Sequence, residues 1–381
     1  MSIYSWQKEV WRKLAEQARG NSQGSSMSSA HAVLLRGRKG LGKLAFATAL
    51  AKSRLCVTPS VEGEACRSCL SCRWFEQGSH PDFRLVEPQA LSTLSTISGT
   101  ADDIRDDDGA DTEARSTTRT AADAGTESGG AKTGKKPSKQ ISVAQIRELA
   151  DFINISSHQN GYKIILIHPA ETMNPAAANA LLKSLEEPPL RTLFILVSHH
   201  AQFLLPTIRS RCRQIPMPTP DPATAIAWLQ QQEVKDPETC LASAGYAPLA
   251  ALEFNDENYL ERHGAFVKQI STRDNFNPIV LAEEMQKSDL PTVVNWLQKW
   301  CYDLMSFHLT SKIRYHLDRT AVIKSLASGI DPHAMATYLR TLAETQQLAS
   351  HPLNPRLFLE ELLFSYATVL SLGTELPKRM N

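Results

Sequence analysis

A glycine-rich loop between an apolar strand and a helix places the strongest constraint on the fold. The segment Gly37-Arg-Lys-Gly-Leu-Gly-Lys43-Leu44 has the spacing of a nucleotide-binding P-loop, with the apolar segment 31–36 before it and a helical pattern over 44–52 after it. In such a loop, backbone N–H groups cradle phosphates, the lysine reaches the terminal ones, and a hydroxyl on the next residue ligates Mg²⁺. Leu44 has no oxygen to offer. The flanking strand and helix favour a true P-loop over a chance glycine turn, so the sequence predicts a phosphate loop without its metal ligand, at Gly37, Gly40, Gly42, Lys43 and Leu44.

A second position needed for hydrolysis is also altered. The apolar strand 163–167 should end in an acid that holds Mg²⁺, but His168 and Pro169 stand there. Glu171 is near in sequence, yet its offset from the strand end is expected to point it elsewhere. Metal and water activation supply most of phosphoryl-transfer catalysis, so we expect no intrinsic ATPase. Lys43 leaves binding of ATP or ADP open. The rival hypothesis is an active ATPase that recruits Mg²⁺ through water or Glu171.

Four of the seven cysteines lie close together in a C-x9-C-x2-C-x2-C pattern. Four thiolates make a closed tetrahedral Zn²⁺ site with no open position for water, so the pattern predicts a structural zinc ion bound by Cys56, Cys66, Cys69 and Cys72. Coincidental clustering of buried thiols is the alternative. A zinc-dependent nucleic-acid-binding module is less favoured, because Arg67 and Arg73 do not form a broad basic patch with interleaved aromatic residues.

The bulk composition excludes some classes of protein. A net charge of +1 gives no global field toward nucleic acid or anionic lipid, so any DNA contact must be local or made through partners. No apolar run approaches the roughly 18 residues of a membrane span, and the N-terminus lacks a signal-peptide pattern. We therefore expect a cytoplasmic protein with no membrane partner.

The chain divides into regions of different pattern. Apolar segments at 31–36, 163–167 and 192–197, separated by helical patterns, predict an α/β domain with a parallel sheet covered on both faces. We expect this domain over 1–216, with a zinc module at 56–72 and a disordered insert at about 91–139 of Ser, Thr, Ala, Gly and Asp. After the prolines of 216–222 only helical patterns follow, which predicts a helical lid over 217–255 and an all-α collar over 256–381.

Two apolar stripes mark the expected collar helices. They consist of Val293, Val294, Leu297, Trp300, Leu304 and Phe307, and of Leu357, Leu359, Leu362, Leu363, Tyr366 and Leu370. Either stripe can form a domain core or share its helix with an oligomer interface.

Specific motifs carry a family resemblance. Lys183-Ser-Leu-Glu-Glu-Pro-Pro189 and Ser210-Arg211-Cys212, together with the cysteine cluster, His80-Pro-Asp82 and Gly245-Tyr-Ala-Pro-Leu249, resemble motifs of the delta-prime subunits of the bacterial DNA polymerase III clamp loader, within the AAA+ class. The resemblance covers nearly the whole chain apart from the insert.

The resemblance implies a non-hydrolysing stator. Such a subunit joins the delta and the ATP-hydrolysing gamma/tau subunits in a hetero-pentameric ring that loads the beta sliding clamp onto primed DNA during replication. It is part of the DNA-directed DNA polymerase (nucleotidyltransferase) holoenzyme in the bacterial cytoplasm and meets the nucleoid through the replisome. Arg211 would act in trans on the neighbouring ATP site, as an arginine finger does. The absence of a sensor arginine between Gly245 and Leu252 agrees with a subunit that does not turn over ATP.

Overall fold

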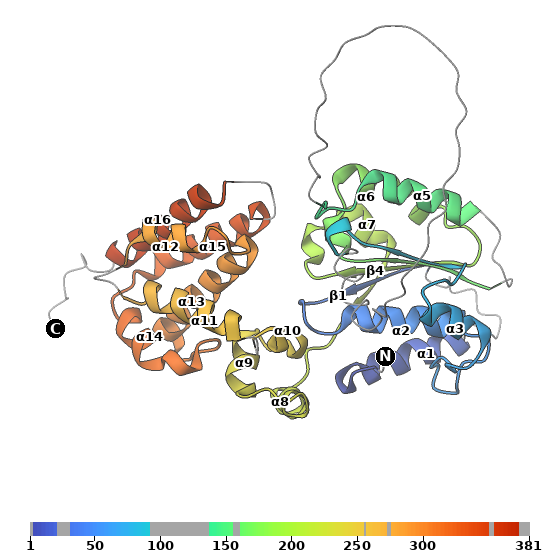
Figure 1. The fold of residues 1–381 in the computed structure, drawn as a ribbon, viewed down its shortest axis with the longest axis horizontal. Coiled ribbons are helices and arrows are strands. Elements are labelled where there is room, and N and C mark those ends of the chain that lie inside the picture. The colour runs from blue at the N-terminus through green and yellow to red at the C-terminus, as the bar shows by residue number, and fades with distance from the viewer. Residues whose placement is uncertain are drawn as a thin grey trace, which may run out of the picture. The chain divides into compact units, whose positions relative to one another are not determined.

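The computed structural model shows two compact units (Figure 1), one formed by Met1–Gly37 and Lys43–Met217 and the other by Arg38–Gly42 and Pro218–Asn381. It describes residues 3–20, 31–91, 137–154, 161–254, 257–272, 276–349 and 354–372. The insert predicted at about 91–139 lies, apart from its two ends, outside the described residues.

The first unit is built on a five-stranded parallel sheet with the order β2-β3-β4-β1-β5. Its strands are β1 (Ala32–Arg36), β2 (Phe83–Val86), β3 (Lys163–Ile167), β4 (Thr192–Ser198) and β5 (Arg213–Pro216). The predicted α/β class and the three predicted strands are confirmed, whereas β2 and β5 were not predicted. Because all strands run the same way, their carboxyl ends meet at one edge of the sheet, where α/β proteins place their sites.

Both faces of the sheet are buried, which explains the continuous apolar runs of its strands. Ile164 and Leu166 of β3 enter the core on one face, while Ile165 and Ile167 enter the core on the other. Helices cover the two faces separately (Figure 1), with α5, α6 and α7 on one side and α1 and α2 on the other. These helices, with the short α3 beside α2, are α1 (Lys8–Gly20), α2 (Lys43–Leu55), α3 (Leu70–Glu76), α5 (Val143–Asn154), α6 (Pro175–Glu186) and α7 (Pro206–Arg211).

The described part of the second unit is helical and holds two separate apolar clusters. The smaller cluster lies among three helices within the range of the predicted lid: α8 (Pro222–Gln231), α9 (Pro237–Ser243) and α10 (Pro248–Glu253). Two of these helices start at an aspartate followed by proline: Asp221 and Asp236 accept backbone N–H groups of the first turn, and a proline needs no such partner. Local sequence therefore fixes where these helices begin.

The larger cluster lies among the helices of the predicted collar range, where Trp300 donates to the hydroxyl of Tyr366 at 2.8 Å in the buried centre. The helices are α11 (Glu257–Ile270), α12 (Pro278–Met285), α13 (Leu290–Thr310), α14 (Thr320–Ala327), α15 (Pro332–Leu348) and α16 (Pro355–Leu372). Both predicted stripes lie on helices of this cluster, α13 and α16. Leu357 of the second stripe is 62% exposed and lies outside this core.

Candidate functional site

Lys43, the lysine of the predicted phosphate loop, begins α2 and is buried, with 2% of its surface exposed. Burial lowers its pKa to about 8, and the negative charge of Glu171 opposes part of that shift. The next residue, Leu44, packs against the apolar cluster between α2 and the sheet. The position that would carry a metal-binding hydroxyl is thus used for packing.

Glu171 supplies the negative charge near Lys43. One of its oxygens, Oε1, accepts the backbone N–H groups of His199 at 2.8 Å and His200 at 3.2 Å, just beyond β4. The other oxygen, Oε2, is buried and makes no hydrogen bond with any residue that the structure describes. The expectation that this side chain points elsewhere was wrong. A short 3₁₀ turn at Ala170–Thr172 after β3 brings the carboxylate back toward the edge of the sheet.

His168 occupies the place of the missing acid, directly after β3. Its Nδ1 lies 2.9 Å from Oε1 of Glu87, which follows β2, and each side chain is 12% exposed. The ring of His199, beyond β4, stands edge-on to His168 with centroids 5.4 Å apart. The carboxyl ends of β2, β3 and β4 therefore present an imidazole and carboxylate cluster. Glu87 was missed from the sequence because only the sheet order brings it to His168.

The middle of the glycine loop, Arg38–Gly42, belongs to the second unit. The carbonyl of Gly40 accepts the backbone N–H of Leu249 in α10 at 3.0 Å, and Arg38 donates from Nη1 to the carbonyl of Gly245 at 3.0 Å. A Cβ atom on Gly40 would meet Ala250 at 2.6 Å, and its φ of +83° also favours glycine. At this position the loop therefore needs glycine for its contact with the lid as well as for its turn.

Arg211 is the last residue of α7. Its Nη2 lies 2.6 Å from Oε1 of Glu186, the last residue of α6, and its Nη1 donates to the carbonyl of Thr207 at 3.1 Å. The side chain is 34% exposed. The structure thus presents a guanidinium that is oriented by two contacts and still reachable from outside the unit.

The four clustered cysteines converge as predicted. Their sulfur atoms all lie within 4.8 Å of one another, with Cys56 and Cys69 at 4.0 Å and Cys66 and Cys72 also at 4.0 Å. A tetrahedral ZnS₄ site with bonds of about 2.3 Å has its sulfurs about 3.8 Å apart, so the spacing fits. Backbone N–H groups of Cys66 and Cys69 point at Sγ of Cys56 and of Cys66 at 3.3 Å, as suits thiolates. The group can hold a metal ion. Within the described residues, it is the single cluster of three or more metal-ligating side chains.

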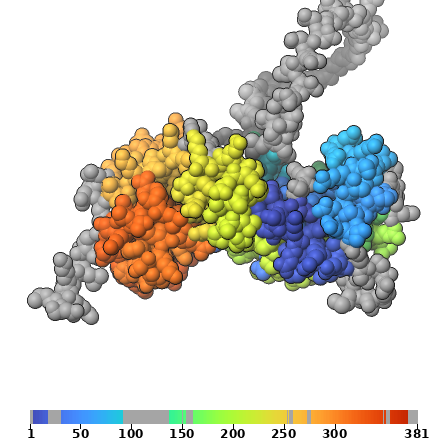
Figure 2. Space-filling view, turned by 90° about the horizontal axis from the view of Figure 1, so that it is seen from below, coloured from blue at the N-terminus to red at the C-terminus, as the bar shows by residue number. Residues whose placement is uncertain are grey.

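The cysteine segment packs against α1. Trp11 donates from its indole nitrogen to the carbonyl of Glu62 at 3.0 Å, and Gly63 approaches Ala15 so closely that a Cβ would lie 2.9 Å from it. Figure 2 shows the surfaces of α1 in dark blue and of the cysteine segment in light blue side by side. Folding of the segment around a metal ion would therefore support the N-terminal helix as well.

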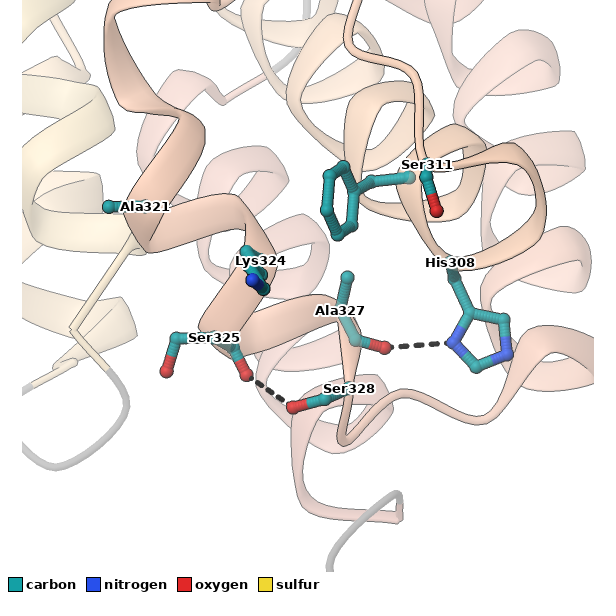
Figure 3. Close-up of a pocket in the computed structure, with 8 residues that line it drawn as sticks. His308, Ser311, Ala321, Lys324, Ser325, Ala327 and Ser328 are labelled. Atoms are coloured by element: carbon teal, nitrogen blue, oxygen red, sulfur yellow. Dashed lines mark hydrogen bonds between the residues drawn. The ribbon is translucent and has the colours of Figure 1, made fainter.

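A surface pocket of about 560 Å³ lies in the collar between α13 and α14 (Figure 3). There Nδ1 of His308 lies 2.8 Å from the carbonyl of Ala327, and Ser328 donates to the carbonyl of Ser325 at 2.8 Å. These polar groups bond the ends of the helices themselves. Phe307 of the first apolar stripe lines the pocket, but the glycine loop, the cysteine cluster and the Ser210-Arg211-Cys212 motif contribute no residue to it. We therefore do not regard this pocket as the functional site.

The described helices include none with both the length and the apolar character needed to span a lipid bilayer.

Fold and sequence together define an α/β protein with a P-loop-like segment that has no hydroxyl after its lysine and no acid directly after β3. The model of the family described as "DNA polymerase III, delta subunit" matches residues 6–221, and that of its C-terminal part matches residues 257–368. The chain belongs to the family of the DNA polymerase III subunit delta-prime.

Proteins with that name align with this chain over nearly their whole length. The DNA polymerase III subunit delta' of Pseudomonas aeruginosa is 30% identical, with 96% of this chain and 98% of the relative covered. The protein of the same name from Escherichia coli is 24% identical, with 99% of both chains covered. A solved DNA polymerase III gamma subunit-related protein from Thermotoga maritima is 14% identical, covers 96% of this chain and 99% of its own, and has a TM-score of 0.37, too low to add to the assignment.

Proposed function

We propose that this chain is the non-hydrolysing stator of a bacterial clamp loader. It joins delta and gamma/tau subunits in a hetero-pentameric ring, which places the beta sliding clamp on primed DNA. Arg211 acts in trans at the neighbouring gamma/tau ATP site. The lid and collar serve as separate domains, the collar holding the ring together. The observation that carries the proposal is the contrast between a nucleotide loop without catalytic partners and an oriented, accessible guanidinium on the same unit.

The residue types at the glycine loop and at Arg211 support these two different roles. Leu44 offers no metal ligand and His168 stands where an acid must hold Mg²⁺, so the loop lacks two parts of a hydrolysing site. A guanidinium, by contrast, stays protonated and can spread several donors over the developing charge of a transferred phosphoryl group. An active ATPase with a non-standard metal site is not favoured, because Leu44 and His168 offer no hydroxyl or carboxylate to Mg²⁺ and Oε1 of Glu171 is engaged by the backbone beyond β4.

The four cysteines bind a structural zinc ion in this proposal. Their spacing fits tetrahedral ligation, and four protein ligands leave no open position for water chemistry. The ion stabilises the segment between α2 and α3 without entering the reaction.

The experiment is an ATPase assay of the chain alone and of the loader assembled with gamma/tau and delta subunits, the clamp and primed DNA. The chain alone should show no turnover. In the assembly, Arg211→Ala should leave folding intact and slow hydrolysis at the adjacent site by about a thousandfold, so that the total rate falls by that site's share. Arg213→Ala, an exposed arginine on β5, is the matched control and should retain the wild-type rate. Turnover by the isolated chain, or a wild-type rate with Arg211→Ala, would contradict the proposal.

A further inference from the structure

The guanidinium of Arg211 is held from two sides within the first unit. The carboxylate of Glu186 binds one terminal nitrogen at 2.6 Å, and the carbonyl of Thr207 binds the other at 3.1 Å. Thr207 lies one turn earlier in the same helix, so this second contact also satisfies a backbone carbonyl at the helix end. Glu186 supplies the only ion pair of Arg211 among the described residues.

Both residues of the ion pair adjoin buried residues of the core. Arg211 lies between Ile208 and Cys212, which are 0% and 7% exposed in the core that α6 and α7 share. Glu186 follows Leu185, which is 1% exposed and whose carbonyl lies 2.9 Å from Nε2 of His31 at the start of β1. Because both helix ends adjoin core residues, the fold sets the backbone positions from which the side chains of Glu186 and Arg211 extend.

The contacts leave part of the guanidinium available. Arginine carries five N–H donors, and the two contacts engage one terminal nitrogen each, with a third of the side chain exposed. An ion pair this exposed contributes little to the stability of the protein. Its effect lies in orientation, because a long side chain without it would have to be ordered at the moment of catalysis.

We propose that Glu186 is a positioning residue for the trans-acting arginine, holding the guanidinium of Arg211 with its remaining donors directed to the phosphates of the neighbouring site. This inference rests on the proposed function. The carboxylate is bonded to the arginine and touches no substrate itself. Through this ion pair, the end of α6 in one subunit orients the arginine that acts at the ATP site of the next subunit.

The test compares Glu186→Ala and Glu186→Gln in the fully assembled loader with the clamp and primed DNA present. The readout is the part of the ATPase rate that Arg211→Ala abolishes. Glu186→Ala should lower kcat for this part about fivefold, with KM for ATP unchanged, because the orientation matters in the transition state. Glu186→Gln should recover most of the loss, since its amide oxygen still accepts from the guanidinium. Glu187→Ala, at the next exposed residue, is the matched control and should behave as wild type.

A double variant separates this inference from the function on which it rests. Glu186→Ala added to Arg211→Ala should cause no further loss, because the carboxylate acts only through the arginine. Wild-type or higher rates with Glu186→Ala, or an equal loss with Glu186→Gln, would overturn the positioning role. A wild-type rate with Arg211→Ala would instead remove the arginine finger, and this inference with it.

Discussion

At the scale of single residues, the glycine loop combines the spacing of a P-loop with an apolar side chain at the position of the hydroxyl. Leu44 has an apolar side chain where a hydroxyl would stand, and it packs against the apolar cluster between α2 and the sheet. Glu171 places a carboxylate near the buried Lys43. A bound phosphate would normally provide that negative charge. The internal carboxylate lets the lysine remain in the fold, with its charge partly compensated.

The buried Lys43 should give stability a dependence on alkaline pH. Its pKa is lowered from 10.5 to about 8 in the folded chain, so between these values the unfolded chain binds more protons. The free energy of unfolding of wild type relative to Lys43→Met should therefore rise as pH increases from about 8 to 10.5, and stay level below pH 8. Urea unfolding at several pH values measures this difference. Lys183→Met, at an exposed position on α6, is the control. A level difference across the window would show that Lys43 is not desolvated.

Site residues could be predicted from the sequence where a motif with fixed spacing contains them. The glycine loop, Leu44, His168 and the four cysteines all follow from spacing alone. Glu171 and Glu87 could not be placed in this way. The first depends on a short turn after β3, and the second depends on β2 pairing beside β3 at the sheet edge.

At the scale of elements, the cysteine segment links α2, α3 and α1. Cys69 caps the N-terminus of α3 by accepting the backbone N–H of Cys72, and Trp11 fastens α1 to the same segment. A metal ion on the four sulfurs would hold these elements in one arrangement, because the segment has little apolar core of its own.

Removal of the metal should therefore destabilise the chain. Elemental analysis should find one zinc ion per chain. A strong chelator should lower the Tm of the first unit by at least about 5 °C. Cys66→Ala should bind no zinc and should no longer respond to the chelator. Cys240→Ala, which removes a buried cysteine of the lid, should keep its zinc. Full zinc content in the Cys66→Ala protein would contradict the assigned ligand set.

The elements missed from sequence share a physical cause. Strands β2 and β5 are four residues long, and each buries a single residue, so neither carries a continuous apolar run or an alternation. They are the first and last strands in the sheet order, so each pairs with one neighbouring strand only. The central strands β3 and β4 are buried at every position and were therefore visible as apolar segments.

At the scale of the whole molecule, the chain forms two compact units, and the second contains the loop residues Arg38–Gly42 together with Pro218–Asn381. Sequence pattern could not assign this short loop to the second unit, because its partner is the distant helix α10. The division of the second unit into lid and collar domains stays a prediction. Its apolar clusters are separate, but polar contacts join the lid to the collar.

Asp303 of α13 holds a loop that takes part in a further polar contact of this kind. It is 0% exposed and accepts the backbone N–H groups of Arg314, Tyr315 and His316 at 2.8 to 3.2 Å, with Nδ1 of His316 at 2.9 Å. The loop so held offers the carbonyl of Tyr315 to Ser243 at the end of α9, 3.4 Å away. One buried carboxylate therefore fixes a loop that contacts the end of α9.

Asp303→Asn should loosen the second unit and leave the first intact. The amide keeps the size of the side chain but turns its own NH₂ group toward the backbone N–H donors of the loop, which then lose an acceptor. We therefore expect the free energy of unfolding to fall by about 3 kcal/mol. Urea unfolding followed by tryptophan fluorescence measures the loss, and zinc release reports the first unit in the same samples. Asp318→Asn, an exposed aspartate paired with Arg319, is the matched control and should change stability by less than about 1 kcal/mol. Early zinc release in Asp303→Asn would show that the two units unfold together, and wild-type stability would show that the buried carboxylate does not hold lid and collar as one unit.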